Sequence, residues 1–263
     1  MNYKKLSHQD SQGNISGVVT VEQQMGSDYV LKYSKPERRL PESVWRNLFE
    51  QAKIEGLQFG AKKIGCRLRK DYDVEIFSKI LFDLDFIKKS ERIEYKLDLN
   101  LLPNDVGTPF HWKTAQDLSW SKRQIADFVS KIIEGAPDTD PNENPEEFIE
   151  DFLSHNEFTS GPDCIGIGFL NDVACALVVA QIEVKSGWSR LSYMGLMRAY
   201  RGKNLGKWVH RHGFEMMRSQ GGTLYHGGTL TNNYPMRKLF ENHRCHVIYE
   251  MSEWQLRLND GAR

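Results

Sequence analysis

The 263-residue chain lacks several features that would place it in a special class of protein. No stretch approaches the roughly 18 consecutive apolar residues of a membrane-spanning helix. No charge of one sign is in excess, because 35 Lys and Arg balance 35 Asp and Glu, which argues against a general nucleic-acid binder. The first ten residues lack the apolar segment of a signal peptide. We therefore expect neither a membrane nor a nucleic acid as partner.

The cysteines and histidines also lack the spacing of metal or redox sites. The four cysteines, Cys66, Cys164, Cys175 and Cys245, are scattered, and no two of them have the spacing of a zinc ribbon or a redox pair. We interpret them as buried free thiols, which predicts a reducing compartment and a cytoplasmic location. His210, His212, His243 and His246 have no carboxylate at ligand spacing. We expect no metal cofactor.

What is present is an ordinary globular composition, with 40% hydrophobic and 27% charged residues. The length suits one large domain or two modest ones. The segment 102–109 is rich in proline, glycine and other breakers, which makes it the best boundary candidate. We predict a domain over residues 1–103 and a second domain over residues 109–263.

Hydrophobic periodicity predicts a mixture of helices and strands. Asn171-Asp172 separates two apolar runs and has the signature of a hairpin turn. The segment 92–99 alternates apolar and polar residues, as a half-buried strand does. We predict helices over 42–55, 73–82, 122–133 and from Pro145, and strands over 15–21, 63–68, 92–99, 110–114, 164–169, 173–184 and 190–197.

The two ends of the predicted domains have similar sequences. Leu81-Phe82 precedes Tyr95-Lys-Leu-Asp-Leu by nearly the same separation as Leu239-Phe240 precedes Trp254-Gln-Leu-Arg-Leu. Each pair is reached through a helix that follows a glycine-flanked strand. We interpret this as an internal duplication.

The segment 193–210 has the most informative chemistry in the chain. A predicted strand runs into a short basic loop with Gly202 and Gly206, and a helix begins at once. Glycines let the backbone turn tightly, so that free N–H groups point into the turn, and the helix N-terminus adds partial positive charge. Arg201, Lys203 and Lys207 add formal charge. The segment is therefore a candidate pyrophosphate site.

These residues carry a resemblance to a known family. Arg201-Gly-Lys-Asn-Leu-Gly resembles the Arg/Gln-x-x-Gly-x-Gly/Ala loop of the GCN5-related N-acetyltransferases, and the preceding Leu196-Met-Arg-Ala-Tyr is similar to the end of their cofactor strand. Asn233-Tyr-Pro-Met-Arg-Lys-Leu-Phe resembles the family's second signature, Asn-x-x-Ala-x-x-Leu-Tyr. The segment 223–230 lies between them and is similar to the strand that splays from its neighbour. The resemblance covers about residues 109–258.

The resemblance implies a fold and an activity. The fold is α+β, a mostly antiparallel sheet with splayed strands flanked by helices, preceded by a smaller, degenerate copy in residues 1–103. The activity is direct transfer of an acetyl group from acetyl-CoA, as co-substrate, to an amine of a small molecule or peptide. The residues that the resemblance assigns to cofactor binding are Met194, Leu196, Arg201, Gly202, Lys203, Asn204, Leu205, Gly206, Lys207 and Asn233.

The catalytic groups are less defined than the cofactor loop. A base is needed because an alkylamine is charged at neutral pH, and Glu183 and Tyr193 are the candidates on strands expected to face the cleft. The acid that protonates the leaving thiolate could be Tyr234, Tyr225 or His226. Gly227 and Gly228, which follow His226, are expected to let a ligand approach closely.

Two departures from the family pattern leave other functions open. Asn204 replaces the first loop glycine, although Asn tolerates left-handed backbone. Phe240 stands where many members carry the tyrosine that acts as acid. The chain could therefore be an impaired acyl-CoA sensor, or an interaction module whose loop binds a phosphorylated partner. The acidic loop at 138–147 could attract a cationic acceptor, and we expect a monomer or homodimer.

Overall fold

The computed structural model describes residues 2–9, 11–23, 27–34, 40–70, 73–103, 107–136, 144–154 and 158–256. The chain forms two compact units: unit 1 is Met1–Ile93 with Tyr249–Arg263, and unit 2 is Glu94–Ile248. These units differ from the predicted ranges 1–103 and 109–263. The difference arises because two strands, β5 (Phe86–Asp98) and β11 (His246–Leu256), each run from one unit into the other.

Unit 1 is a sheet in the order β1-β2-β3-β4-β11-β5 with two helices. Its remaining elements are β1 (Tyr3–Gln9), β2 (Ile15–Gln23), β3 (Asp28–Ser34), α1 (Glu42–Gln58), β4 (Lys63–Arg69) and α2 (Val74–Asp83). β4 pairs antiparallel with β11 but parallel with β3. The periodicity located β2, β4 and both helices, but not β1 and β3. β1 shows why, because its residues are exposed or half-buried throughout and carry no alternating apolar signal.

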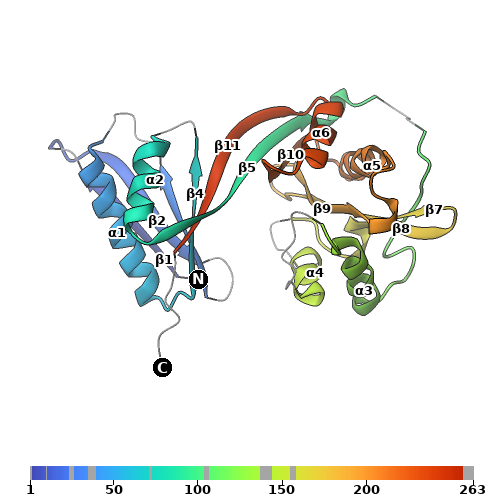
Figure 1. Ribbon diagram of the computed structural model, residues 1–263, viewed down its shortest axis with the longest axis horizontal. Coiled ribbons are helices and arrows are strands. Elements are labelled where there is room, and N and C mark those ends of the chain that lie inside the picture. The colour runs from blue at the N-terminus through green and yellow to red at the C-terminus, as the bar shows by residue number, and fades with distance from the viewer. Residues whose placement is uncertain are drawn as a thin grey trace. The chain divides into compact units, whose positions relative to one another are not determined.

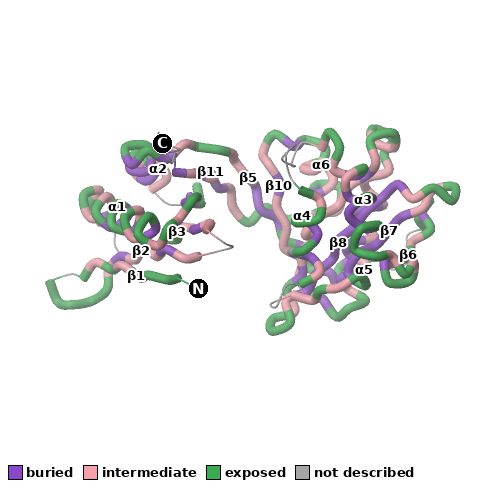
Figure 2. Tube along the Cα trace, turned by 90° about the horizontal axis from the view of Figure 1, so that it is seen from below, coloured by how far each residue is buried: buried purple, intermediate pink, exposed green. Residues whose placement is uncertain are grey.

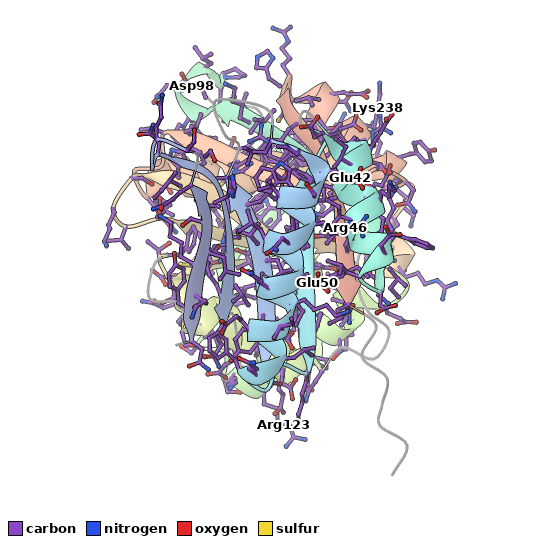
Figure 3. The ribbon with its side chains drawn as sticks, turned by 90° about the vertical axis from the view of Figure 1, so that its left-hand side faces the viewer. Glu42, Arg46, Glu50, Asp98, Arg123 and Lys238 are labelled. Carbon is purple, nitrogen blue, oxygen red and sulfur yellow. The ribbon has the colours of Figure 1, made fainter. Side chains whose placement is uncertain are left out.

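The core of unit 1 lies between its sheet and one face of each helix. Trp45, Phe49 and Phe77 are fully buried, and Trp45 and Phe49 each contact Phe77, with ring centroids 5.0 and 5.6 Å apart. The opposite side of α1 is charged, with Glu42, Arg46 and Glu50 spaced four residues apart along it (Figure 3). This split of apolar and charged faces at helical spacing is why α1 could be predicted from the sequence.

Unit 2 has a sheet in the order β5-β10-β9-β8-β7-β6. Figure 1 shows α3 and α4 on one face of this sheet and α5 and α6 on the other. β8 is buried along nearly its whole length, as a central strand covered on both faces should be (Figure 2). The elements are β6 (His111–Thr114), α3 (Lys122–Ile133), α4 (Pro145–Leu153), β7 (Ile165–Leu170), β8 (Val173–Ile182), β9 (Trp188–Leu196), α5 (Gly206–Ser219), β10 (Leu224–Leu230) and α6 (Tyr234–Asn242).

Local sequence signals explain several of these elements. The predicted hairpin between β7 and β8 is present, because Asn171 and Asp172 both adopt the positive φ angles, 49° and 62°, that this turn requires. α3 begins with a capping box formed by Ser121 and Gln124. No helix of the described residues is long and apolar enough to cross a membrane.

The two halves of the chain repeat one order of elements. Three strands, a helix, a strand, a helix and a final strand occur as β1 to β5 with α1 and α2, and again as β7 to β11 with α5 and α6. In each copy the third and fourth strands pair in parallel, β3 with β4 and β9 with β10. The expected internal duplication therefore agrees with the order of elements.

Candidate active site

The sheet of unit 2 opens between β9 and β10. The two strands pair in parallel only where they begin, Leu224 with Trp188 and Tyr225 with Ser189, although both are described to their ends. We call the unpaired parts, residues 190–196 and 226–230, the β9–β10 opening. On its other side β9 pairs with β8, and the register shifts between Val179 and Ala180 so that Ser192 is left over as a bulge.

The basic loop lies where β9 ends. A 3₁₀ turn over Arg198–Tyr200 leads into residues 201–207, which we call the anion loop. Gly202 and Asn204 have φ angles of 73° and 58°, so both adopt the left-handed backbone. Asn204 thus takes the conformation expected of the glycine it replaces, as few other residues do.

The backbone of the anion loop presents unused donors. Among the described residues, none accepts a hydrogen bond from the N–H groups of residues 202–207. In unit 2, α3, α4 and α6 each have a side-chain cap, from Ser121, Asn144 and Asn233, whereas the N-cap residue of α5 is Leu205, which offers none. Uncapped N–H groups at a helix start, together with the helix dipole, form a site for an anion.

The three basic side chains of the anion loop have different roles. Arg201 donates three hydrogen bonds to backbone carbonyls, those of Leu196, Gly135 and Ile132, at 2.7 to 2.9 Å. Its guanidinium therefore fastens the loop to the end of α3. Lys203 is exposed and Lys207 is half-buried, with their ammonium groups beside the rings of Tyr200 and Trp208.

α6 supports the first turn of α5. Asn233 caps α6, because its side chain accepts a hydrogen bond from the Met236 N–H at 3.1 Å. His243 Nε2 lies 3.1 Å from the Lys207 carbonyl oxygen. A Cβ atom at Gly206 would lie 3.3 Å from Leu239 Cδ1, so this glycine permits close packing of α5 on α6.

Several solved structures are similar to this chain in fold. A GCN5-related N-acetyltransferase from Sphaerobacter thermophilus is 11% identical, with a TM-score of 0.69 over 95% of this chain and 79% of that chain. A tandem GNAT protein from the clavulanic acid biosynthesis pathway is 10% identical, with a TM-score of 0.61 over 97% of this chain and 82% of that chain. An acetyltransferase from the GNAT family of Colwellia psychrerythraea is 14% identical, with a TM-score of 0.58 over 96% and 85%.

The chain has the GNAT fold. The likeness extends over nearly the whole chain, so both copies of the repeated order take part in it, as the tandem interpretation expected. No family model and no curated protein matches the sequence. At 10 to 14% identity the likeness establishes the GNAT fold alone, and the activity depends on which side chains the fold brings to the site.

The two predicted bases of the GNAT site have structural partners. The Glu183 carboxylate accepts a hydrogen bond from the Ser186 hydroxyl, in the turn between β8 and β9. Tyr193 packs edge-to-face on Phe148 of α4, with ring centroids 5.2 Å apart. Glu183 thus stabilises a turn and Tyr193 contributes to packing, as these residue types commonly do.

The two tyrosines predicted as acids differ in how far they are buried. Tyr225 is fully buried, and burial raises the pKa of its hydroxyl well above the usual value. Tyr234 is 70% exposed, with the Arg237 guanidinium beside its ring. Phe240 is fully buried against Tyr95, with ring centroids 4.1 Å apart, and has no hydroxyl to offer. Of this group only Tyr234 is accessible.

His226 has a partner that the sequence did not reveal. Its Nε2 lies 3.5 Å from Oε2 of Glu94 on β5, the strand next to β10. Glu94 is 8% exposed, although the alternation of residues 92–99 placed it on a solvent face. The expectation that Gly227 and Gly228 admit a ligand is corrected. A Cβ at Gly228 would collide with the Glu94 carboxylate and one at Gly227 with the Tyr225 hydroxyl, at 2.2 and 2.1 Å.

A second polar cluster lies beside the bulge in β9. Gln181 is fully buried, and its Oε1 accepts hydrogen bonds from Arg190 and from the Ser192 hydroxyl. Its Nε2 donates to the Thr159 carbonyl at 3.1 Å. These contacts hold the bulged part of β9 in place. Periodicity could not single out Gln181, because it lies within the apolar run that identified β8.

Two further expectations concern metals and the acidic loop. In the part of the chain that the structure describes, no group of three or more His, Cys, Asp and Glu side chains is placed to hold a metal ion. The four cysteines are free. Most of the acidic loop at 138–147 falls outside the described residues.

Proposed function

We propose that the chain transfers an acetyl group from acetyl-CoA to an amine of a small molecule or a peptide. The observation that carries this proposal is the β9–β10 opening, which ends at six backbone N–H groups without acceptors among the described residues. Two neighbouring strands that separate toward an anion site suit a thioester on a pyrophosphate-bearing arm. The GNAT fold supports the proposal by analogy.

The residues of the β9–β10 opening and of the anion loop suit different parts of acetyl-CoA. The backbone of Met194 and Leu196 lies in the unpaired part of β9 and would bind the pantetheine arm. The amides of residues 202–207 would bind the pyrophosphate, assisted by Lys203 and Lys207. Arg201 would act indirectly, by holding the anion loop on the end of α3.

The reaction would be a direct attack of the amine on the thioester carbonyl. Backbone N–H groups near the bulge in β9 would polarise the carbonyl, as an oxyanion hole does. Tyr225 is fully buried and Phe240 has no hydroxyl, so we assign neither of them the protonation of the leaving group. A thiol with a pKa near about 8.5 is a tolerable leaving group, so transfer does not require a strong acid.

Binding of acetyl-CoA tests the proposal through the anion loop. In isothermal titration we expect one acetyl-CoA to bind per chain, with about tenfold or greater weakening in the double variant Lys203→Glu with Lys207→Glu, because two attractive charges become repulsive. Lys185→Glu, a charge reversal at an exposed site in the β8–β9 turn, is the control and should retain affinity.

Turnover separates the candidate functions. The acceptors are putrescine, tyramine, glucosamine, lysine and a tripeptide with a free amino end, and the measured quantity is CoA release. Binding with turnover supports the enzyme. Binding without turnover supports an acyl-CoA sensor, which the buried Phe240 in place of a tyrosine would favour. If acetyl-CoA does not bind, both are excluded and an interaction module remains. The free cysteines agree with a reducing, cytoplasmic setting, which belongs to the same proposal.

A further inference from the structure

Glu94 and His226 form a carboxylate–imidazole pair at the narrow end of the β9–β10 opening. His226 follows Tyr225, the last residue of β10 that pairs with β9, so it stands where the two strands begin to separate. The Glu94 side chain is 10% exposed and that of His226 is 28% exposed. Oε2 of this carboxylate lies 3.5 Å from Nε2 of His226.

The alternation of side chains places the pair on the face of the sheet opposite to α5 and α6. Tyr225 contacts Phe214 of α5, and Tyr95 stacks on Phe240 of α6. Because neighbouring residues of a strand point to opposite faces, His226 and Glu94 lie on the face away from α5 and α6. That face is covered by α3 and α4 and also holds Tyr193, which packs on Phe148.

Gly228 leaves the space that the Glu94 carboxylate occupies. It lies two residues after His226 on the same face of β10, and the Glu94 carboxylate occupies the space that any larger side chain would need. The other ring contact of His226 is Trp188 of β9, edge-to-face at 5.5 Å. The imidazole is therefore held between a carboxylate on β5 and an indole on β9.

We propose that Glu94 orients His226, and that His226 is the base that takes the proton from the acceptor amine. This inference rests on the acetyltransferase function proposed above. The carboxylate beside Nε2 favours the tautomer that carries hydrogen on Nε2, which leaves the lone pair on Nδ1. Nε2 is buried and makes no hydrogen bond in this structure, with Oε2 of Glu94 3.5 Å away, and no described residue bonds to Nδ1. We expect this contact to shorten to a hydrogen bond when substrate binds, because catalytic contacts are often long in empty sites.

The proton and electron changes balance in this scheme. The amine nitrogen forms a bond to the thioester carbon, and the carbon–sulfur bond breaks with its electron pair on sulfur. The ammonium form of the acceptor first loses one proton to water, and the neutral amine attacks. Nδ1 takes the second proton, which the nitrogen releases as the bond forms, and the imidazolium passes it to the thiolate. Glu94 stays ionised throughout and stabilises the imidazolium. The products are the N-acetylated amine and CoA.

Several other charges share the face of His226. β5 supplies Glu94, with Arg92 and Lys96 two residues to either side of it, and β10 itself supplies none. β9 presents Trp188 and, two residues on, Arg190, whose guanidinium bonds to Gln181. β5 belongs to the first copy of the repeated order, and β10 to the second. The final strand of the first copy would therefore supply the positioning residue of the site built by the second.

Kinetics of matched variants test the dyad. With the best amine acceptor, we expect His226→Gln to lower kcat by about 100-fold or more, and Glu94→Gln to lower kcat by about tenfold or more, with little change in the Kd for acetyl-CoA. The pH profile of kcat/KM should differ between Glu94→Gln and the wild type, because the imidazole loses the carboxylate that fixes its tautomer. Glu94→Asp keeps the carboxylate and should retain the wild-type profile.

The control is a second histidine–glutamate pair of unit 2. Glu215 Oε2 lies 3.9 Å from His212 Nδ1 on α5, on the other face of the sheet, and Glu215→Gln should retain the wild-type pH profile. A wild-type profile in Glu94→Gln, with turnover intact, overturns the dyad and leaves the acetyltransferase standing. Binding of acetyl-CoA without turnover on any amine overturns the proposed function, and the dyad with it.

Discussion

At the scale of single residues, the burial of two histidines of α5 makes the free energy of unfolding depend on pH. His212 stacks on Trp112, with ring centroids 3.9 Å apart, and burial lowers its pKa to about 4. His210 is fully buried among aromatic rings, and burial lowers its pKa as well. Both are neutral in the folded chain at a pH where an unfolded histidine already binds a proton.

The free energy of unfolding should therefore fall as the pH is lowered from about 6.5 toward 4. In that window the unfolded state binds protons that the folded state excludes, and His212 alone accounts for something on the order of 3 kcal/mol. Urea denaturation at several pH values measures the slope. His212→Phe keeps the stack on Trp112 and should flatten the slope, whereas the exposed His246→Phe should not. An unchanged slope in His212→Phe contradicts this account.

Two other residues show what can and what cannot be predicted from the sequence at this scale. The left-handed backbone of Asn204 could be predicted, because it follows from residue type and local spacing. The burial of Glu94 could not, since its own strand alternates as if Glu94 faced solvent. Glu94 can be buried because Gly228, on a strand far along the chain, leaves space for its carboxylate. The sequence shows a glycine two residues after a histidine, but the strand order decides which side chain fills the space that this glycine leaves.

At the scale of elements, the equivalent strand pairs of the two units differ. β9 and β10 are paired at two positions, whereas β3 and β4 are paired at four, from Asp28 with Lys63 to Leu31 with Cys66. Beyond these pairs the Arg69 N–H donates a hydrogen bond to the Tyr33 hydroxyl at 3.1 Å. A side chain thus bridges β3 and β4 where the equivalent strands of unit 2 stay open.

Removing this bridge should destabilise unit 1. Tyr33→Phe deletes only the hydroxyl and leaves the ring against Phe49 and Phe77, so we expect a loss of about 1 kcal/mol in the free energy of unfolding. Tyr3→Phe, at an exposed position of β1, is the control. Chemical denaturation measures both, and equal stability of the two variants would show that the bridge contributes nothing.

The elements also differ in how well they could be predicted from their sequences. α3 was predicted with the residue limits that it has, because a capping box and one apolar stripe define it. β3 was not predicted, although Tyr29 and Leu31 are buried on it, since its alternation covers too few residues to stand out among turns. The opening between β9 and β10 came from the family resemblance, because periodicity carries no information on which strands separate.

At the scale of the whole molecule, β5 and β11 are the reason why the two units differ from the predicted domains. The predicted domain 109–263 contains the anion loop and both signature motifs, yet it lacks β5, which is the neighbour of β10. The breaker-rich segment 102–109 thus lies within unit 2. Composition marked a break in the pattern of elements but could not show that the strand before it pairs with one about 130 residues later.

A chain of residues 109–263 alone should therefore fail to fold as the full chain does. It would expose the edge of β10 and lack Glu94, so we expect loss of cooperative unfolding and of acetyl-CoA binding. The comparison is a chain of residues 84–263, which retains β5. Circular dichroism melts and titration with acetyl-CoA measure the outcome. A cooperative melt for residues 109–263 equal to that of the full chain would show that β5 is dispensable.

The position of β11 in unit 1 also affects the order of events at the ribosome. β4 pairs with β11, and Lys70 at the end of β4 bonds to Glu250, 180 positions away. The N-terminal copy is therefore synthesised long before the strand that completes its sheet emerges. Until then the edge of β4 is exposed to other nascent chains, so the yield of native protein should depend on the speed of translation and on chaperones that cover exposed strands.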